Sequence, residues 1–289
     1  MNNVLKKCNL CPRNCLVDRT KTTGICGMKD KLVVAKAYLH EWEEPCISGT
    51  NGSGTIFLSG CSLDCVFCQN YKISKQPVGK TYSPFELSEE IKKLESLGVH
   101  NVNFVTPTHF SDLIIETLDI YRPSIPIVYN TSGYELPSII EKLNDYVDVY
   151  LVDMKYSDNE IAKKFSNVNN YVDFCRNSIE VMVKNKPLLY DENGLLKQGV
   201  IIRHLVLPDN LKNTYGVIDF FADNYKDKAL FSVMSQFVPM YNSSITRTLK
   251  PIEYKLVTNY ILKRDIEDCF IQELSSAVDT YTPDFDTNF

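Results

Sequence analysis

The sequence predicts an α/β fold built on a parallel sheet, and two observations support that prediction. From Gly54 onward, six short apolar runs alternate with segments of helical periodicity, which is the pattern of repeated strand–helix units. Strands joined in this way run parallel with right-handed crossovers, so the sheet is either open and doubly wound or curled into a partial barrel. The length of 289 residues suits one such domain with a sizeable core.

The first half of the pattern is regular. Ser83 is a favoured N-cap, Pro84 suits the first helical position, and Gly98 ends the first predicted helix. Further helices are expected around residues 113–118 and over residues 136–143. The first four predicted strands are residues 54–59, 101–105, 125–129 and 147–152.

The second half repeats the alternation less cleanly. Residues 188–198 resemble a small hairpin that turns at residues 191–194. Two more strands are expected at residues 200–206 and 229–237. The predicted helices of this half are residues 171–184, 211–225 and a closing helix at 251–263.

Composition excludes several functional classes. A formal net charge of −5 argues against a broad nucleic-acid surface. No segment has the roughly 18 uninterrupted apolar residues of a membrane span, and residues 1–7 lack the apolar core of a secretory signal. We therefore expect a cytoplasmic protein with no membrane or nucleic-acid partner. Because that compartment keeps thiols reduced, the ten cysteines require an explanation other than disulfides, and eight of them lie within the first 68 residues.

Three cysteines follow the first predicted strand directly. Cys61, Cys65 and Cys68 have the spacing C-x3-C-x2-C, so they supply three thiolates for one iron–sulfur cubane and leave a fourth iron open. An open iron suits a cluster that must bind and reduce a substrate. A structural zinc site normally has four protein ligands and a different spacing, and three buried structural cysteines this close together would be rare.

The motif C-x3-C-x-aromatic-C, with Phe67 as the aromatic residue, resembles that of the radical SAM superfamily. The resemblance covers most of the chain from Gly54 onward. It implies a partial (β/α)6 barrel, a [4Fe-4S] cluster on the three cysteines, and S-adenosylmethionine (SAM) bound to the open iron. It also implies reductive cleavage of SAM to a 5′-deoxyadenosyl radical that takes a hydrogen atom from a substrate.

Several strand ends are similar to those of activating enzymes of the pyruvate formate-lyase type, and barrel chemistry lies at such ends. The resemblance implies that Lys155 pairs with the SAM carboxylate and that Asp153 receives its ammonium group or a monovalent cation. Arg203 is expected to reach the carboxylate or a substrate. Family members usually carry Gly-Gly-Glu after the second strand, where this chain departs from the pattern and we expect backbone or hydroxyl oxygens to substitute. The remaining SAM or cation contacts expected are Asn130, Thr131, Thr106 and Thr108.

The N-terminal segment carries a second cysteine motif. Cys8, Cys11, Cys15 and Cys26, spaced C-x2-C-x3-C-x10-C, are four thiolates that can close a tetrahedral metal site. Such a site suits zinc and an auxiliary [4Fe-4S] cluster equally. The motif resembles that of uncharacterised homologues of pyruvate formate-lyase activating enzyme. We expect a cysteine-rich extension over residues 1–50 and the catalytic core over residues 51–289.

The resulting functional hypothesis is a radical SAM oxidoreductase that is similar to an activating enzyme. Its hydrogen donor is a glycyl radical enzyme, another protein or peptide, or a small molecule, and its electron donor a low-potential flavodoxin or ferredoxin. The alternatives are a non-catalytic iron–sulfur or zinc protein on the same fold, and a radical SAM methyltransferase or methylthiotransferase. The sequence names neither the substrate nor the oligomeric state, nor does it show whether SAM is consumed or regenerated.

Overall fold

The computed structural model of the chain describes residues 6–276 and 283–285. Its centre is one large sheet with the strand order β10-β9-β8-β6-β5-β4-β2-β1-β3. Seven strands run parallel to their neighbours: β2 (Ser53–Leu58), β4 (Val102–Val105), β5 (Ile127–Thr131), β6 (Val149–Asp153), β8 (Leu196–Leu205), β9 (Leu230–Met234) and β10 (Cys269–Ile271). The expected α/β class with a mainly parallel sheet is confirmed.

Three further strands are antiparallel to a neighbour. They are β1 (Leu32–His40), which lies between β2 and the edge strand β3 (Lys80–Tyr82), and the short β7 (Leu189–Tyr190), which pairs with the start of β8. The β7–β8 pair is the hairpin that the sequence predicted.

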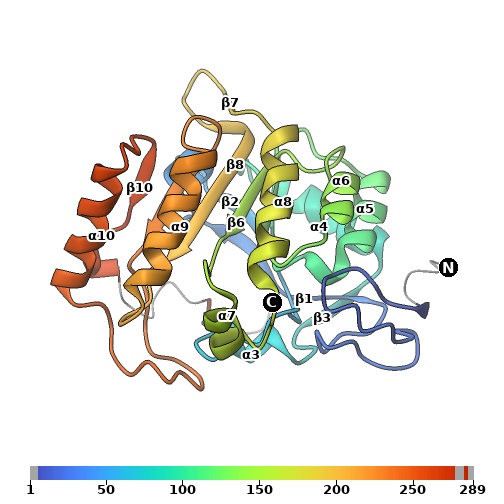
Figure 1. Cartoon of the computed structure of the whole chain (residues 1–289). Helices are drawn as coiled ribbons and strands as arrows, with labels where there is room; N and C mark the ends of the chain where they lie inside the picture. The colour runs from blue at the N-terminus through green and yellow to red at the C-terminus, as the bar shows by residue number, and fades with distance from the viewer. Residues whose placement is uncertain (1–5, 277–282, 286–289) are drawn as a thin grey trace.

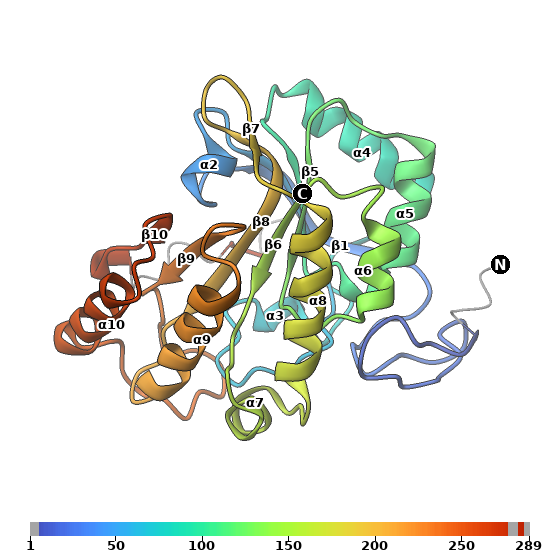
Figure 2. The same ribbon diagram turned by 45° about the horizontal axis from the view of Figure 1, so that its top comes forward.

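The helices follow one another round the outside of the sheet, as Figures 1 and 2 show from two directions. The longer helices are α4 (Pro84–Ser96), α5 (Ser111–Ile120), α6 (Pro137–Leu143), α7 (Asn159–Ser166), α8 (Tyr171–Asn185), α9 (Leu211–Asn224) and α10 (Pro251–Lys263). The short turns are α2 (Pro45–Ser48), α3 (Tyr71–Ser74), η1 (Thr108–Phe110) and η2 (Leu274–Ser276). No helix among the residues described combines the length and the apolar content of a membrane span.

Helix α4 begins as the sequence predicts. The Ser83 hydroxyl accepts the Glu86 amide at 3.2 Å, while the Glu86 carboxylate accepts the Ser83 amide at 2.8 Å. This capping box satisfies two amides that the first turn would otherwise leave without partners. The helix then buries Leu87, Ile91 and Leu94, which repeat at helical spacing on one face.

The central strands are buried and mainly apolar, with helices packed round the outside of the sheet. Strand β4 is buried at all four residues, and in β6 only Asp153 is more exposed than its neighbours. Continuous apolar runs are what such doubly covered parallel strands require. The polar residues Asn130, Thr131 and Asp153 stand at the ends of β5 and β6, while Asn103 is buried within β4.

Strand β1 was not predicted. It pairs with β2 from Val34 opposite Leu58 to His40 opposite Ser53, so the sheet continues across the boundary expected at residue 50. The segment 32–40 alternates too weakly between apolar and polar residues to give a clear strand signal. Strand β10 and η2 also follow α10, which is therefore not the last element of the chain.

Candidate active site

A cavity opens at the carboxyl edge of the parallel strands. Its walls come from the loop after β2, from the ends of β4, β5, β6, β8 and β9, and from the turn after β1. Each residue predicted to hold the cluster or SAM lines this cavity except Thr108. The structure thus brings together side chains from positions 61 to 203, although their roles in binding stay predictions.

The loop after β2 carries the three cysteines into this cavity. Gly60 turns the chain with a φ of +92°, and a Cβ there would lie 2.8 Å from the His109 ring, so the turn requires glycine. The loop is also tied to α7: the Val66 amide donates to the Phe165 carbonyl at 2.9 Å, and Cys65 Sγ lies 2.9 Å from Ser166 Oγ. These contacts hold the loop over the strand ends.

The three thiols are chemically suited to become metal ligands. Burial raises the pKa of Cys61 and Cys65, and raises the pKa of Cys68 to about 12, while the charge of Lys155 opposes the rise at all three. Without a metal, the sulfurs are therefore protonated at neutral pH. A bound cluster replaces those protons, because metal ligation requires the thiolate.

Phe67 lines the same cavity as these thiols. Its ring packs edge-on against Phe165 and Phe237, with centroid distances of 6.1 and 5.8 Å. This aromatic group excludes water from one side of the cavity.

Within residues 6–276 and 283–285, no three histidine, cysteine, aspartate or glutamate side chains are arranged to hold a single metal ion. The fit of a metal group at either cysteine motif therefore rests on the donor chemistry and on the placement of the loops. Three thiols on one loop, facing one cavity, fit a cluster that needs three protein ligands.

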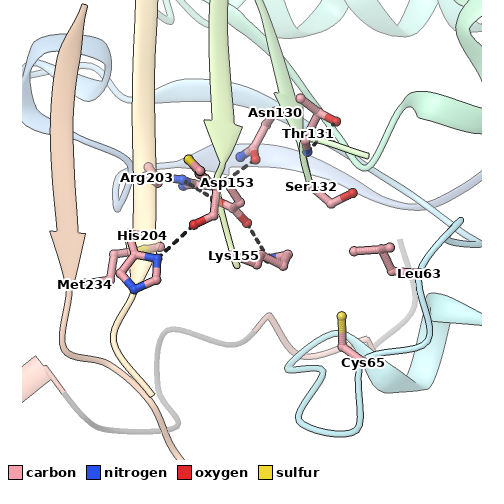
Figure 3. Close-up of polar contacts among 12 residues, drawn as sticks. Leu63, Cys65, Asn130, Thr131, Ser132, Asp153, Lys155, Arg203, His204 and Met234 are labelled. Carbon is pink, nitrogen blue, oxygen red and sulfur yellow. Dashed lines mark hydrogen bonds and ion pairs between the residues drawn. The ribbon is translucent and has the colours of Figure 1, made fainter. Parts of the chain in front are cut away.

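A largely buried ion-pair network occupies the strand ends opposite the cysteine loop (Figure 3). Asp153 at the end of β6 accepts from Lys155 Nζ at 2.7 Å and from Arg203 Nε at 2.8 Å. Arg203 on β8 also donates to Asn130 Oδ1 at 2.8 Å and to Glu43 Oε2 at 3.1 Å. Adjacent parallel strands place these residues side by side, since Asp153 is in register with Arg203.

The network fixes the charge state of its members. Burial alone would raise the pKa of Asp153, but Arg203 and Lys155 outweigh it and hold the pKa at about 2. Burial would likewise lower the pKa of Arg203 and of Lys155, and the neighbouring carboxylates raise both instead. Asp153, Lys155 and Arg203 are therefore ionised at neutral pH.

Two carboxylates of this network come from the turn after β1. Glu43 accepts from Asn103 Nδ2 at 2.9 Å and from Asn130 Nδ2 at 3.2 Å, in addition to Arg203. Glu44 lies 3.9 Å from Arg203, and burial raises its pKa. Adjacent acids such as these ordinarily form a solvated face, but here both side chains are largely buried beside Arg203. The available signal was a pair of acids directly before Pro45, without any partner nearby in sequence.

The oxygens proposed for a monovalent cation are engaged by the protein itself. Both carboxylate oxygens of Asp153 accept from cations, and the Asn130 amide bonds both Arg203 and Glu43. The Thr131 hydroxyl donates to Glu135 Oε1 at 2.5 Å. Asp153, Asn130 and Thr131 thus have protein partners in this structure in place of a shared ion.

Thr108 lies outside the residues that line the cavity, and its expected contact with SAM stays a prediction. Its hydroxyl donates to Glu135 Oε1 at 2.6 Å, beside Thr131. Glu135 is fully buried, its Oε2 has no hydrogen-bond partner among the residues described, and burial raises its pKa to about 7. Sequence reasoning missed Glu135, whose i+4 spacing from Thr131 was the only available signal.

Thr106 and His109 differ in placement although they flank the same turn. Thr106 lines the cavity, adopts a φ of +60°, and donates its amide to the Asn130 carbonyl at 2.9 Å. His109 is buried outside the cavity lining, where Nε2 donates to the Ser59 carbonyl at 2.7 Å. Burial lowers the pKa of His109 to about 3, so the ring is neutral and supports the loop.

The N-terminal cysteines lie in one folded loop next to the cluster loop. Cys8, Cys11 and Cys26 are buried and Cys15 is half-buried. A Cβ on Gly24 would lie 3.3 Å from the Cys26 sulfur and 3.6 Å from the Cys15 sulfur, so both sulfurs face that glycine. Burial raises the pKa of Cys8, Cys11 and Cys26, and each thiol also feels the charge of others in the group.

The two cysteine segments are in direct contact. The Cys61 amide donates to the Cys26 carbonyl at 3.2 Å, and Lys75 Nζ donates to the Cys61 carbonyl at 3.0 Å. Gly27, with a φ of +84°, packs so closely on Lys75 that a Cβ would lie 2.4 Å from its carbonyl oxygen. The N-terminal loop therefore forms part of the support beneath the first cluster cysteine.

Comparison with known proteins gives concordant results. A model of the Radical SAM superfamily matches residues 55–193. An uncharacterised protein of Methanocaldococcus jannaschii is 35% identical over 251 residues, which cover 83% of this chain and 69% of that protein.

Solved structures with low sequence identity share the fold. Streptococcus suis SuiB bound to S-adenosylmethionine is similar with a TM-score of 0.52 and 15% identity, over 75% of this chain and 49% of that one. The FeFe-hydrogenase maturase HydG from Carboxydothermus hydrogenoformans is similar with a TM-score of 0.52 and 16% identity, over 80% of this chain and 56% of that one. The chain thus spans about half the length of these two structures.

Proposed function

Because this chain belongs to the radical SAM superfamily, we propose that it cleaves SAM reductively and uses the resulting radical to abstract hydrogen from a substrate. One observation carries the proposal: Cys61, Cys65 and Cys68 line the same cavity as Asp153 and Lys155. A [4Fe-4S] cluster on the three cysteines, when bound, supplies the electron that breaks the sulfur–C5′ bond of SAM.

The strand-end residues have distinct proposed roles in holding SAM. Lys155 lines the cavity with its positive charge and is the proposed partner of the SAM carboxylate. The backbone at Thr106, turned by its positive φ at the cavity wall, is the proposed acceptor for the SAM ammonium group. Arg203 is proposed as a positioning residue, because its guanidinium already bonds the side chains of Asp153, Glu43 and Asn130.

We propose a second metal centre at Cys8, Cys11, Cys15 and Cys26, either zinc or an auxiliary iron–sulfur cluster. Its support is the four-thiol donor set and the burial of three of the four residues. The substrate proposed is a glycine of a protein or peptide, as for an activating enzyme, with a low-potential flavodoxin or ferredoxin as the electron donor.

The decisive experiment is a SAM-cleavage assay on anaerobically purified protein whose iron, sulfide and zinc have been measured. With a strong reductant, wild-type protein carrying about four irons on these cysteines should convert SAM to 5′-deoxyadenosine and methionine. The triple variant Cys61→Ala/Cys65→Ala/Cys68→Ala should lose those irons and all 5′-deoxyadenosine formation. Cys46→Ala is the matched control, because Cys46 is a half-buried thiol on α2 outside this cavity.

A fully iron-loaded wild type that forms no 5′-deoxyadenosine would contradict the proposal and favour a non-catalytic metal protein. With cleavage established, electron paramagnetic resonance of mixtures with candidate proteins tests the substrate class. A glycyl radical signal supports the activating role, and methyl transfer to the substrate in its place would identify a methyltransferase.

A further inference from the structure

Residues 283–285, near the C-terminal end, lie against the active-site cavity. Pro283 is one of the residues that line the cavity, and Phe285, two positions further along the chain, is half-buried. The Asp284 carbonyl between them accepts from Lys36 Nζ at 2.7 Å. Three consecutive residues thus supply a contact with the cavity, a backbone hydrogen bond and a partly buried aromatic ring.

The Phe285 ring packs on a small apolar cluster, which we call the Phe285 site. Its buried members are Ala35, Phe57, Ile73 and Val105. The Phe285 ring stands edge-on to Phe57, with 5.7 Å between the ring centroids and 73° between the ring planes. All the members except Ala35 also line the active-site cavity. The Phe285 site is therefore continuous with the cavity that holds the cluster cysteines.

The contacts of residues 283–285 are of the kind by which proteins bind a separate peptide. A lysine that takes a main-chain carbonyl binds any peptide, whereas an apolar site that takes an aromatic ring selects for one side chain. The three residues belong to no helix or strand, and Asp284 is exposed. The segment can therefore leave the cavity without breaking an element of the fold.

We infer that the Phe285 site binds an aromatic side chain of a peptide substrate, and that residues 283–285 occupy it until the substrate arrives. The inference rests on the function proposed above and narrows its substrate class to a peptide segment with an aromatic residue beside the reacting position. Pro283 and Phe285 are two positions apart, so a peptide held in the same way reaches the cavity within two residues of its aromatic side chain.

An internal segment in this site competes with the substrate. The apparent affinity for a peptide is lowered by the fraction of molecules in which the site is already filled. Because residues 283–285 are tethered to the chain, their effective concentration at the site is high. Removal of the Phe285 ring should therefore make a foreign aromatic peptide bind more tightly.

The test is titration calorimetry of iron-loaded, full-length protein with SAM under anaerobic conditions and without reductant, so that no turnover occurs. The probes are acetyl-Pro-Asp-Phe-amide, the sequence of residues 283–285, and acetyl-Pro-Asp-Ala-amide, which lacks the ring. Wild type is compared with Phe285→Ala. The matched control is Phe85→Ala, because Phe85 is an exposed phenylalanine on α4 outside the cavity lining.

Phe285→Ala should bind the Phe peptide about fivefold or more tighter than wild type, because its internal competitor is weakened. The Phe peptide should bind about fivefold or more tighter than the Ala peptide, because only the former fills the apolar site. Phe85→Ala should match wild type with both peptides.

A second pair of variants tests the contact with the main chain. In the Phe285→Ala protein, Lys36→Met should weaken binding of the Phe peptide about threefold or more, because the peptide carbonyl loses a charged donor. Lys80→Met is the matched control. Lys80 also rests on a tyrosine, with Nζ 4.8 Å from the Tyr82 ring centroid, as Lys36 Nζ lies 5.2 Å from that of Tyr38. Lys80 does not line the cavity, so its loss should leave the affinity unchanged.

Three results would overturn the inference: equal binding of the two peptides, no gain in affinity in Phe285→Ala, or no binding of the Phe peptide at millimolar concentration. A melting curve of each variant accompanies the titrations. Failure of Phe285→Ala to fold would overturn the inference as well, because a segment that leaves its site cannot be required for folding.

The proposed function fails separately. If the iron-loaded protein forms no 5′-deoxyadenosine with a strong reductant, the radical function is wrong whatever the peptides do. If it forms 5′-deoxyadenosine but does not distinguish the Phe peptide from the Ala peptide, the radical function stands and the aromatic binding site is overturned.

Discussion

Two arginines with little exposed surface show how differently the two halves of the site are held together. Arg203, at the strand ends, is matched by Asp153, Glu43 and Glu44, whereas Arg19, in the N-terminal loop, donates to the backbone carbonyls of His109 and Lys29. The strand-end half is therefore organised by charges that the chain itself supplies. The cysteine half presents thiols that become charged ligands only if a metal binds, so removal of the proposed metals should affect that half and leave the strand ends unchanged.

The largest expected effect of metal removal is on hydrogen exchange. Chelation under reducing conditions should speed amide exchange in residues 8–28 and 60–68 by about 100-fold or more, because these loops lose their cross-links to the metal. The amides of β5 and β6 should stay protected. Mass spectrometry of the exchanged peptides measures both regions. An equal loss of protection in the cysteine loops and in β5 and β6 would contradict the proposal that only the cysteine loops depend on metal.

Substitution of Arg203 should damage the strand-end half independently of any metal. Arg203→Met leaves Asp153 and Glu43 as buried carboxylates without their main partner, at a cost of about 3–5 kcal/mol in the free energy of unfolding. Arg203→Lys should lower the free energy of unfolding by less, because lysine keeps the positive charge but lacks the forked guanidinium. Urea unfolding with and without metal measures these costs, and a loss below about 1 kcal/mol for Arg203→Met would show that the network is not preorganised.

The pH dependence of stability should distinguish two carboxyl groups whose folded-state pKa values are shifted in opposite directions. The folded-state pKa of Asp153 is about 2, below its unfolded value, so its contribution of about 2 kcal/mol is present above pH 4 and is lost as the pH falls toward 2. The folded-state pKa of Glu135 is about 7, above its unfolded value, so stability should fall as the pH rises from 5 to 8.

The matched variants are Asp153→Asn and Glu135→Gln. Compared with wild type, Asp153→Asn should remove the loss of stability in acid, and Glu135→Gln should remove the loss of up to about 3 kcal/mol between pH 5 and 8. Denaturant midpoints across the pH range measure both. If both variants changed the slope of stability against pH in the same direction relative to wild type, the assignment of the two pKa shifts would be refuted.

The smallest expected effect concerns Thr108. Thr108→Val should lower the free energy of unfolding by about 1–2 kcal/mol, because Glu135 then loses one of its two hydroxyl donors. Its affinity for SAM should match that of wild type, while Lys155→Met should lose affinity. Equilibrium dialysis of the iron-loaded protein decides this, and a loss of SAM affinity in Thr108→Val would restore Thr108 to the binding site.

The sequence predicted what local chemistry determines. The spacing of Cys61, Cys65 and Cys68 is encoded within eight residues, and the α4 start needs only Ser83 and Pro84. The alternation of apolar runs and helices was likewise sufficient for the parallel strands, because continuous burial leaves a strong pattern. These features required no knowledge of which distant segments meet.

The features that the sequence could not show depend on contacts between segments that are far apart in the chain. Glu43 is 160 positions from Arg203 along the chain, and only the antiparallel β1 returns the chain to the interior of the sheet beside it. Arg19 is similar, since a lone arginine between cysteines gives no sign that it will be fully buried against Phe110. Thr108 and Thr106 differ by two positions, and only the backbone turn after β4 decides which of them faces the cavity.

The position of Glu43 has a consequence for how this protein can be recombined. The family match spans residues 55–193, so it contains Asp153 and Lys155 but neither Glu43 nor Arg203. A chimera that exchanged only the matched segment would carry Asp153 and Lys155 into a protein that lacks their partners Glu43 and Arg203. The smallest exchangeable module of this protein therefore begins before β1 and ends after β8, a longer segment than the family signature that identifies it.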